Sequence, residues 1–347
     1  MLHLKKEISE YKRKYDFFPK TIYFGGGTPS LLTADDVSHI VSQINPVKDC
    51  EITLEANPVT ITEEYAASLR RTKINRISLG GQSFIDKELK LLGRLHNSKQ
   101  ITTAFNMLRD AGFENISLDL IYGLPNQTKE DINSSLNKII ELNPEHISTY
   151  CLSLDKDVPL FAKKSMIPED ETVSEFYYLI RERLLEAGYK HYEISNFAKP
   201  GKESRHNLSY WDDKGFLGFG PSAAGYVSFD STKNGNEICD ESEQSIFRYT
   251  NPAHMEKYIK SVSDADIEKN KEYLTEEEHE KEYIFLSLRK AEGISADEFK
   301  TKFKHDFAEK YAGVLQKYKK YIENEAGFYR LVPDAYFVSN EILAEFM

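Results

Sequence analysis

The first half of the chain repeats one hydrophobic pattern: a short apolar run, a polar turn and then a helical stretch. The runs are rich in Ile, Leu and aromatic residues, as expected of strands that are buried on both faces. Strand and helix signals that alternate about every 30 residues predict βαβ units and a parallel sheet. The runs are Thr21–Phe24, Glu51–Glu55, Arg76–Leu79, Ile116–Leu120 and His146–Cys151.

Helix-boundary signals fall between these runs. Two residue pairs have the spacing of a capping box, Thr33 with Asp36 and Thr128 with Asp131. Gly112 stands where a helix that starts near Ser98 should end.

The chain starts with an amphipathic stretch. An apolar stripe with Lys and Glu between its members predicts a helix, and it consists of Leu4, Ile8, Tyr11 and Tyr15. This helix leads directly into the run at Thr21–Phe24. In a series of βα units a strand precedes such a helix, so we expect this sequence to lack the first strand of the series.

After Asp155 the pattern changes. One helix is expected at Glu171–Ala187, and Tyr192–Tyr226 is rich in Gly, aromatic residues and Asn, which indicates loops and strands. Residues 228–244 are polar and predict an exposed loop. The last part predicts three helices and a hairpin, which together resemble a small winged-helix module: 276–290, 295–303 and 305–324, then 328–332 and 336–339 around 333–335.

We therefore expect three parts, at residues 1–165, 166–250 and 251–347. The lysines of the third part have Asp and Glu close by in sequence, which favours a solvated face over a DNA-binding one.

Composition narrows the function further. The 347 residues include 45 Lys and Arg against 56 Asp and Glu, a formal charge of −11 that disfavours nucleic acid as the main partner. No apolar run approaches the ~20 residues of a membrane helix, and no signal-peptide core opens the chain. The three cysteines, Cys50, Cys151 and Cys239, form no disulfide framework and no metal-ligand spacing. We expect a cytoplasmic protein.

Candidate chemistry gathers where the strands end, the edge at which parallel α/β folds place their functional groups. Glycine N–H groups suit a carboxylate, whereas Glu55 and Asp119 suit an ammonium group or ribose hydroxyls. Each feature alone has a plain structural explanation, but together they describe a site for a zwitterion joined to a nucleoside. The strand-end segments are Gly25-Gly26-Gly27-Thr28-Pro29-Ser30, Glu55-Ala56-Asn57-Pro58, Gly80-Gly81-Gln82 and Asp119-Leu120-Ile121-Tyr122-Gly123-Leu124-Pro125.

This ordered set resembles the radical S-adenosylmethionine (SAM) family. Within it, the chain is similar to oxygen-independent coproporphyrinogen III oxidases and to their relatives, the radical-SAM haem chaperones. The resemblance extends from Thr21 through the C-terminal part, and it implies a partial (β/α)6 barrel with SAM across the strand ends. By their place in the motifs, the residues that match SAM contacts are Gly26, Gly27, Thr28, Glu55, Gln82, Arg94 and Asp119.

The sequence departs from the family at the metal cluster. The family holds a [4Fe–4S] cluster with three cysteines in a Cys-x3-Cys-x2-Cys loop after the first strand, and this sequence contains no such loop. Cys50 precedes a strand and Cys151 ends one, so both are interpreted as buried apolar residues. The missing segment would lie before residue 1. We therefore expect no metal ligands in this chain, no radical catalysis by it as printed, and weak SAM binding.

A second motif separates the two branches. Arg205-His206-Asn207-Leu208-Ser209-Tyr210-Trp211 resembles the His-Asn-x-x-Tyr-Trp signature of the haem chaperones. His206 beside Tyr210 and Trp211 suits ligation of haem iron or stacking on a porphyrin. The alternative is a structural histidine in a loop packed by the two aromatic residues, and both interpretations stay open here.

The resulting hypothesis is a haem chaperone of radical-SAM ancestry, which transfers haem to a respiratory or haem-storage protein. The alternative is an oxygen-independent coproporphyrinogen III oxidase, which converts two propionates to vinyl groups in porphyrin biosynthesis. A radical-SAM enzyme acting on tRNA is disfavoured by the acidic charge.

Overall fold

The computed structural model describes residues 1–15, 17–227, 246–264 and 271–347, which divide into two compact units. The first unit, called here the sheet unit, holds residues 22–35 and 51–204. The second, called the helical unit, holds residues 1–21, 36–50 and 205–347. The exposed loop expected at residues 228–244 lies outside the described residues.

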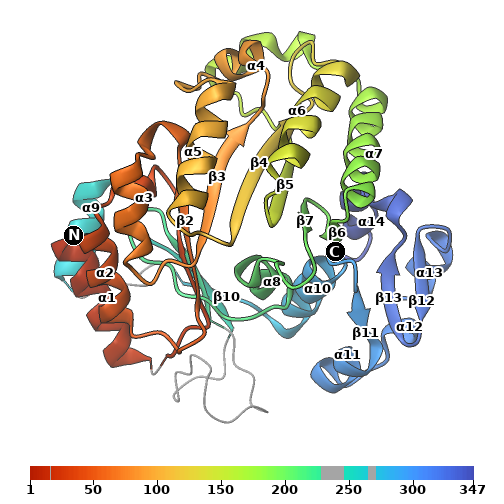
Figure 1. Ribbon diagram of the computed structural model, residues 1–347. Coiled ribbons are helices and arrows are strands. Elements are labelled where there is room, and N and C mark those ends of the chain that lie inside the picture. The colour runs from red at the N-terminus through yellow and green to blue at the C-terminus, as the bar shows by residue number, and fades with distance from the viewer. Residues whose placement is uncertain (16, 228–245, 265–270) are drawn as a thin grey trace. The chain divides into compact units, whose positions relative to one another are not determined.

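The sheet unit is built on one curled sheet of seven strands in the order β1-β2-β3-β4-β5-β7-β6 (Figure 1). Strands β2 to β5 pair in parallel, whereas β7 is antiparallel to both β5 and β6. The five strands expected from the sequence and their parallel sheet are thus confirmed, as a half-barrel. The strands are β1 (Thr21–Phe24, whose first residue belongs to the helical unit), β2 (Glu51–Ala56), β3 (Arg76–Gln82), β4 (Ile116–Tyr122), β5 (His146–Cys151), β6 (Lys190–Glu193) and β7 (Asn196–Ala198).

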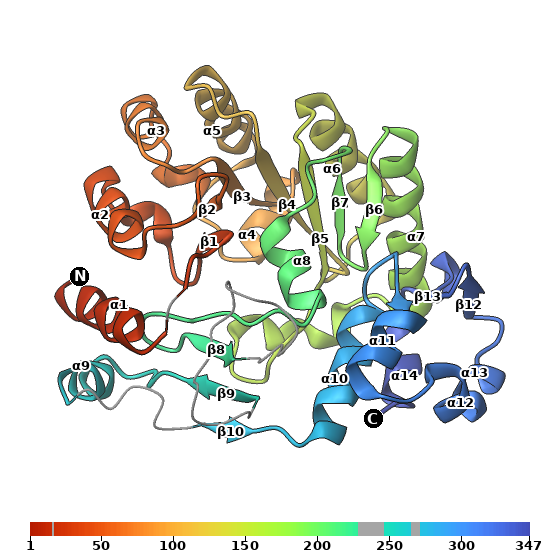
Figure 2. The same ribbon diagram turned by 90° about the horizontal axis from the view of Figure 1, so that it is seen from below.

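One face of this sheet is apolar and lies under helices. Side chains alternate between the faces of a strand, so the register partners Leu54 and Ile77, and likewise Leu118 and Ile147, share a face. All four are fully buried. Four helices run along this side of the sheet (Figures 1 and 2): α3 (Glu63–Arg70), α5 (Ser98–Asp110), α6 (Lys129–Leu142) and α7 (Asp170–Glu186).

The opposite face of the sheet is polar. Glu55, Ser78, Ser117 and His146 are register partners in one row across β2 to β5, and Asp119 follows two residues further along β4. Since helices cover the apolar face, the polar face is the one on which functional groups of this sheet are expected.

Local signals in the sheet unit behave as the sequence predicts. The capping box of Thr128 and Asp131 opens α6, and Gly112 follows α5 with a φ of +93°, a conformation that favours glycine. The shorter helices are η1 (Pro29–Leu31), η2 (Pro58–Thr60), α4 (Asp86–Leu91) and η3 (Pro159–Met166).

The helical unit begins with the expected amphipathic helix, α1 (Leu2–Lys14). Tyr11 of α1 is fully buried, and its ring stacks on that of Tyr249 at a centroid distance of 5.7 Å. The buried Glu7 carboxylate accepts hydrogen bonds from Asn251, Tyr258 and the backbone N–H of Gly220. The elements of this part are α2 (Ala34–Ile44, whose first two residues belong to the sheet unit), α8 (Arg205–Trp211), β8 (Ala224–Val227), β9 (Phe247–Thr250), α9 (Met255–Ser263) and β10 (Glu272–Tyr273).

The C-terminal part of the helical unit combines helices with the three-stranded sheet β11-β13-β12, in agreement with the expected helical, winged-helix-like module. Its elements are α10 (Glu276–Ser287), β11 (Ile294–Ser295), α11 (Ala296–Phe303), α12 (Phe307–Lys310), α13 (Ala312–Lys317), β12 (Ile322–Glu325), β13 (Phe328–Leu331), η4 (Pro333–Ala335) and α14 (Ser339–Ala344). None of the helices in the described ranges has both the length and the apolar character needed to cross a membrane.

Two predictions for this part are wrong. The hairpin joins β12 to β13, and residues 333–335 form a short helix instead of its turn. The helix expected over 305–324 breaks into α12 and α13 and then continues as β12. The hairpin turns at Ala326 and Gly327 instead, where φ is +52° and +84°. Tight two-residue hairpin turns require two such positive φ angles.

Candidate functional site

The glycine loop after β1 faces the carboxylate of Glu55. Gly26 and Gly27 have φ angles of +74° and +60°. The Gly26 N–H donates to Glu55 Oε2 at 3.2 Å, and the Tyr23 hydroxyl donates to Glu55 Oε1 at 2.7 Å. A Cβ atom on Gly25 would lie 2.6 Å from the Tyr23 ring, so the loop needs glycine there. The structure therefore joins the glycine loop and Glu55 into one group, as the sequence indicated.

Asp119 lies half-buried on the polar face of the sheet. Its Oδ1 accepts a hydrogen bond from Ser78 Oγ at 3.4 Å. Burial raises the pKa of Asp119 to about 6, although the hydrogen bond from Ser148 and the charge of Arg76 oppose the rise. The negative charge of Glu55 adds to the rise, so the two carboxylates lie within electrostatic reach of each other.

Tyr23 and Arg76 are site residues that the sequence reasoning missed. Burial first, and then the charge of Glu55, raise the pKa of the Tyr23 phenol, which therefore stays a neutral donor. Arg76 is only 2% exposed, and its charge lowers the pKa of Asp119. The available signal was an arginine opening an apolar strand, because a cation seldom begins a buried run without a counter-charge.

The remaining residues predicted to bind SAM are not linked by hydrogen bonds to the glycine loop and Glu55 in the described part of the chain. Gln82 ends β3 with a φ of +68°, at the point where the register with β4 shifts. Thr28 is exposed and lies just before η1. Arg94 is exposed on the turn after α4. Among the described residues, its side chain makes no hydrogen bond to the other residues predicted to bind SAM.

The motif around His206 lies on a helix, which corrects the expectation of a loop. The helix α8 carries His206 and Tyr210 one turn apart, and their side chains meet. Trp211 ends the helix, with the guanidinium of Arg289 5.1 Å from its ring centroid. Both His206 ring nitrogens are hydrogen-bonded, Nδ1 to Thr21 Oγ1 and Nε2 to the Tyr210 hydroxyl, each at 2.9 Å. The role of His206 in binding haem remains a prediction.

Two histidines of the sheet unit have structural partners. The buried His146 bonds through Nδ1 to Ser117 Oγ and through Nε2 to the Tyr192 hydroxyl, both at 2.8 Å. His191 bonds to the carbonyl of Ile194. These contacts explain both side chains without a ligand.

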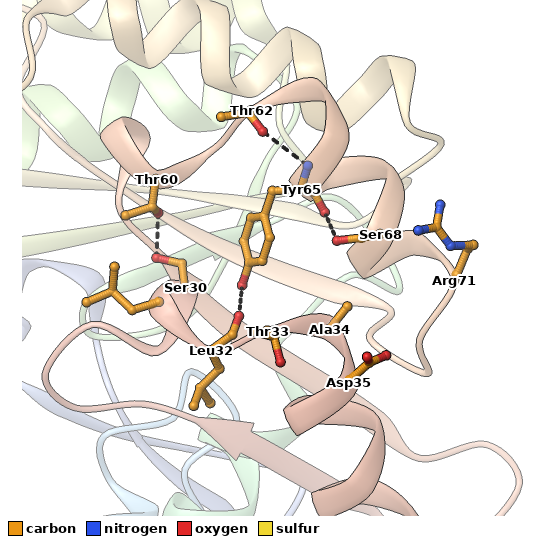
Figure 3. Close-up of a pocket in the computed structure, with 11 residues that line it drawn as sticks. Ser30, Leu32, Thr33, Ala34, Asp35, Thr60, Thr62, Tyr65, Ser68 and Arg71 are labelled. Carbon is orange, nitrogen blue, oxygen red and sulfur yellow. Dashed lines mark hydrogen bonds between the residues drawn. The ribbon is translucent and has the colours of Figure 1, made fainter.

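A surface groove of the sheet unit is separate from these residues (Figure 3). The Tyr65 hydroxyl donates to the Leu32 carbonyl in it, and the Thr60 hydroxyl donates to Ser30. None of the residues predicted to bind SAM or haem lines this groove, which is formed by residues 30–35, 60, 62, 65, 68 and 71.

Comparisons with known proteins identify the family. Residues 3–139 match the radical SAM superfamily, and residues 274–335 match the HemN C-terminal domain. With the half-barrel and its strand-end residues, these matches define a radical-SAM protein.

The relatives specify the branch. The haem chaperone HemW of Lactococcus lactis is 34% identical over 341 residues, which cover 94% of this chain and 84% of that protein. HemW of Bacillus subtilis is 32% identical over 340 residues, which cover 94% of this chain and 85% of that protein. The chain therefore belongs to the HemW family of haem chaperones.

A solved structure supports the fold. Coproporphyrinogen III oxidase (HemN) of Escherichia coli superposes with a TM-score of 0.81, covering 99% of this chain and 81% of that one. Its sequence identity is 22%, so this likeness bears on the fold alone.

Membership of the radical SAM superfamily implies SAM and a [4Fe–4S] cluster. The cysteines of the described residues do not fit the cluster. Cys50 is buried, whereas Cys151 is exposed, which corrects the expectation that both are buried. Within the described residues, no group of three or more His, Cys, Asp or Glu side chains is arranged to hold a metal ion.

The polar groups do fit SAM. Glu55 and Asp119 supply acceptors for an ammonium group and for ribose hydroxyls, and a Cβ atom added to Gly26 or Gly27 would meet no atom within 4 Å, so the backbone there borders open space.

Proposed function

We propose that this protein binds haem in the cytoplasm and delivers it to a haem-requiring protein of the respiratory or haem-storage class. The observation that carries the proposal is the likeness to proteins named haem chaperones over 94% of the chain. The acidic charge and the signature on α8 support it.

In this proposal the two units have different tasks. On α8 of the helical unit, His206 ligates the iron, and Tyr210 and Trp211 supply aromatic contact area. In the sheet unit, SAM is held by Gly26, Gly27, Thr28, Glu55, Gln82, Arg94 and Asp119. When bound, the cluster would supply an electron to SAM, and the described residues contain no site for it.

The alternative is a coproporphyrinogen III oxidase. The likeness to that enzyme at 22% identity supports only a shared fold. Conversion of coproporphyrinogen III to protoporphyrinogen IX by this chain, with SAM and a reductant supplied, would contradict the chaperone proposal.

The test of haem binding is an absorption titration. We expect a saturable Soret band at one haem per chain, which His206→Ala reduces at least about tenfold in affinity because a coordinate bond to iron is lost. His39→Ala is the matched control, since His39 is exposed on α2 of the same unit and should bind haem normally. Equal spectra and affinities for wild type and His206→Ala would exclude His206 as the ligand.

A further inference from the structure

The helix α8 is anchored at its first turn. The Arg205 guanidinium donates to the Asp49 carbonyl at 2.7 Å, and the Ser209 hydroxyl donates to the His206 carbonyl at 2.7 Å. His206 and Tyr210 are four residues apart and share one face of the helix. The His206 ring is therefore presented from a fixed backbone.

Both ring nitrogens of His206 face hydroxyl groups. Thr21, the first residue of β1, places Oγ1 2.9 Å from Nδ1, and Tyr210 places its phenol oxygen 2.9 Å from Nε2. A neutral imidazole has one N–H and one lone pair, so one hydroxyl must accept and the other must donate. Two arrangements satisfy this rule, and they differ in which nitrogen keeps its lone pair.

The acidity of the two hydroxyls separates the arrangements. A phenol is far more acidic than the aliphatic hydroxyl of threonine and is the stronger hydrogen-bond donor. The favoured arrangement has Tyr210 O–H donating to Nε2 and Nδ1–H donating to Thr21 Oγ1.

We infer that Thr21 and Tyr210 hold His206 as the Nδ1–H tautomer, and that Tyr210 covers the Nε2 lone pair until the iron of haem displaces the phenol. This inference rests on the proposed function. Thr21 is then a positioning residue, in the way that a ligating histidine gives its other N–H to a neighbouring acceptor. Tyr210 is a competitor of iron for the same lone pair.

The surroundings of Tyr210 suit a side chain that can be displaced and returned. Its ring meets the edge of Phe216 at a centroid distance of 4.6 Å and an interplanar angle of 86°. The ring is thus held by an aromatic contact on one side and by one hydrogen bond to His206 on the other. Losing the hydroxyl should leave the aromatic contact in place and remove only the competition for Nε2.

The first test needs no haem. In the apo protein labelled with ¹⁵N-histidine, long-range ¹H–¹⁵N correlation spectra distinguish the two tautomers, and His206→Gln assigns the signal. We expect the Nδ1–H tautomer in the wild type, mixed tautomers in Thr21→Val, and recovery in Thr21→Ser, which keeps the hydroxyl. An Nε2–H tautomer in the wild type would overturn the inference and would leave haem binding itself unaffected.

The second test uses haem and the full chain. We expect Tyr210→Phe to bind haem about fivefold more tightly, the effect of one competing hydrogen bond. Tyr318→Phe, a half-buried tyrosine of the same unit, is the control and should not change the affinity. In Thr21→Val we expect a shifted iron–histidine vibration in the resonance Raman spectrum of ferrous haem, and Thr21→Ser should restore it.

The outcomes of the second test distinguish haem ligation by His206 from the roles of Thr21 and Tyr210. If His206→Ala binds haem with an unchanged spectrum, ligation by His206 fails and the inference fails with it. If His206→Ala loses the spectrum while Tyr210→Phe and Thr21→Val match the wild type, ligation stands and the inference alone is overturned.

Discussion

At the residue scale, the half-buried carboxyl group of Asp119 is a titratable group of the sheet unit whose pKa is raised towards neutral pH. Asp119 stands on a polar sheet face with a cation, Arg76, and two serines as its partners. These partners do not fully offset the loss of water, so the pKa of Asp119 rises to about 6. A carboxyl group in this range changes charge near neutral pH.

We predict that SAM binding weakens as the pH falls through about 6. The folded-state pKa of Asp119 lies above its ordinary 3.8, so below pH 6 the folded protein holds a proton on the group that should accept ribose hydroxyls. By the same linkage, the contribution of Asp119 to folding stability is present at low pH and is lost as the pH rises from 3.8 to about 6.

Asp119→Asn should bind SAM about tenfold more weakly at pH 7.5 and lose the pH dependence, because a charged acceptor is replaced by a neutral group. Equilibrium dialysis with labelled SAM measures both effects. Glu114→Gln, at an exposed position before β4, is the control. Equal wild-type affinities at pH 5 and 7.5 would contradict this role for Asp119.

At the element scale, the sequence predicted the helices and strands that have a regular spacing of apolar residues. The parallel strands and helix α1 follow from apolar spacing, and the glycine loop with Glu55 follows from the order of strand ends. The helix α8 was missed because its seven residues include no buried side chain, so they show no apolar stripe. Arg76 was missed because its partner, Asp119, comes from another strand.

The position of the C-terminal hairpin was also not predictable from the local sequence. Its position depends on two positive φ angles at Ala326 and Gly327, and alanine gives no signal for such a conformation. Proline at position 333 was the stronger local signal, and it opens a short helix instead.

We predict that Ala326→Gly stabilises the protein. Alanine at a φ of +52° carries a steric cost of about 1–2 kcal/mol, from which the greater flexibility of glycine in the unfolded chain subtracts part. The expected net gain is about 0.5–1 kcal/mol in the free energy of unfolding. Urea unfolding measures it, with Ala312→Gly in α13 as a control that should destabilise. A loss of stability in Ala326→Gly would contradict the strained turn.

At the scale of the whole molecule, a buried aspartate connects distant segments of the helical unit. Asp213 Oδ2 lies 2.6 Å from both His279 Nε2 and Lys302 Nζ, and its Oδ1 accepts the Tyr226 hydroxyl at 2.6 Å. Although burial disfavours its charge, the bond from His279 and the charge of Lys302 lower the pKa of Asp213. Asp213 therefore joins the end of α8 to α10 and α11, the helices of the C-terminal module.

Asp213→Ala should lower the free energy of unfolding by about 3–5 kcal/mol, because a lysine, a histidine and a phenol lose their buried acceptor. Asp212→Ala, at a partly exposed neighbour with its own lysines, should cost about 1 kcal/mol or less. Chemical unfolding followed by circular dichroism gives both values. Equal costs for the two variants would show that Asp213 has no special role.

A haem chaperone must hand haem to an acceptor, beyond merely binding it. The most direct measurement is stopped-flow transfer of haem from the loaded chain to an apo respiratory cytochrome, compared with apomyoglobin as a passive scavenger. We predict a transfer rate that rises with cytochrome concentration and exceeds the rate of passive loss. Equal rates to both acceptors, independent of their concentration, would mean that haem simply dissociates and would contradict the chaperone function.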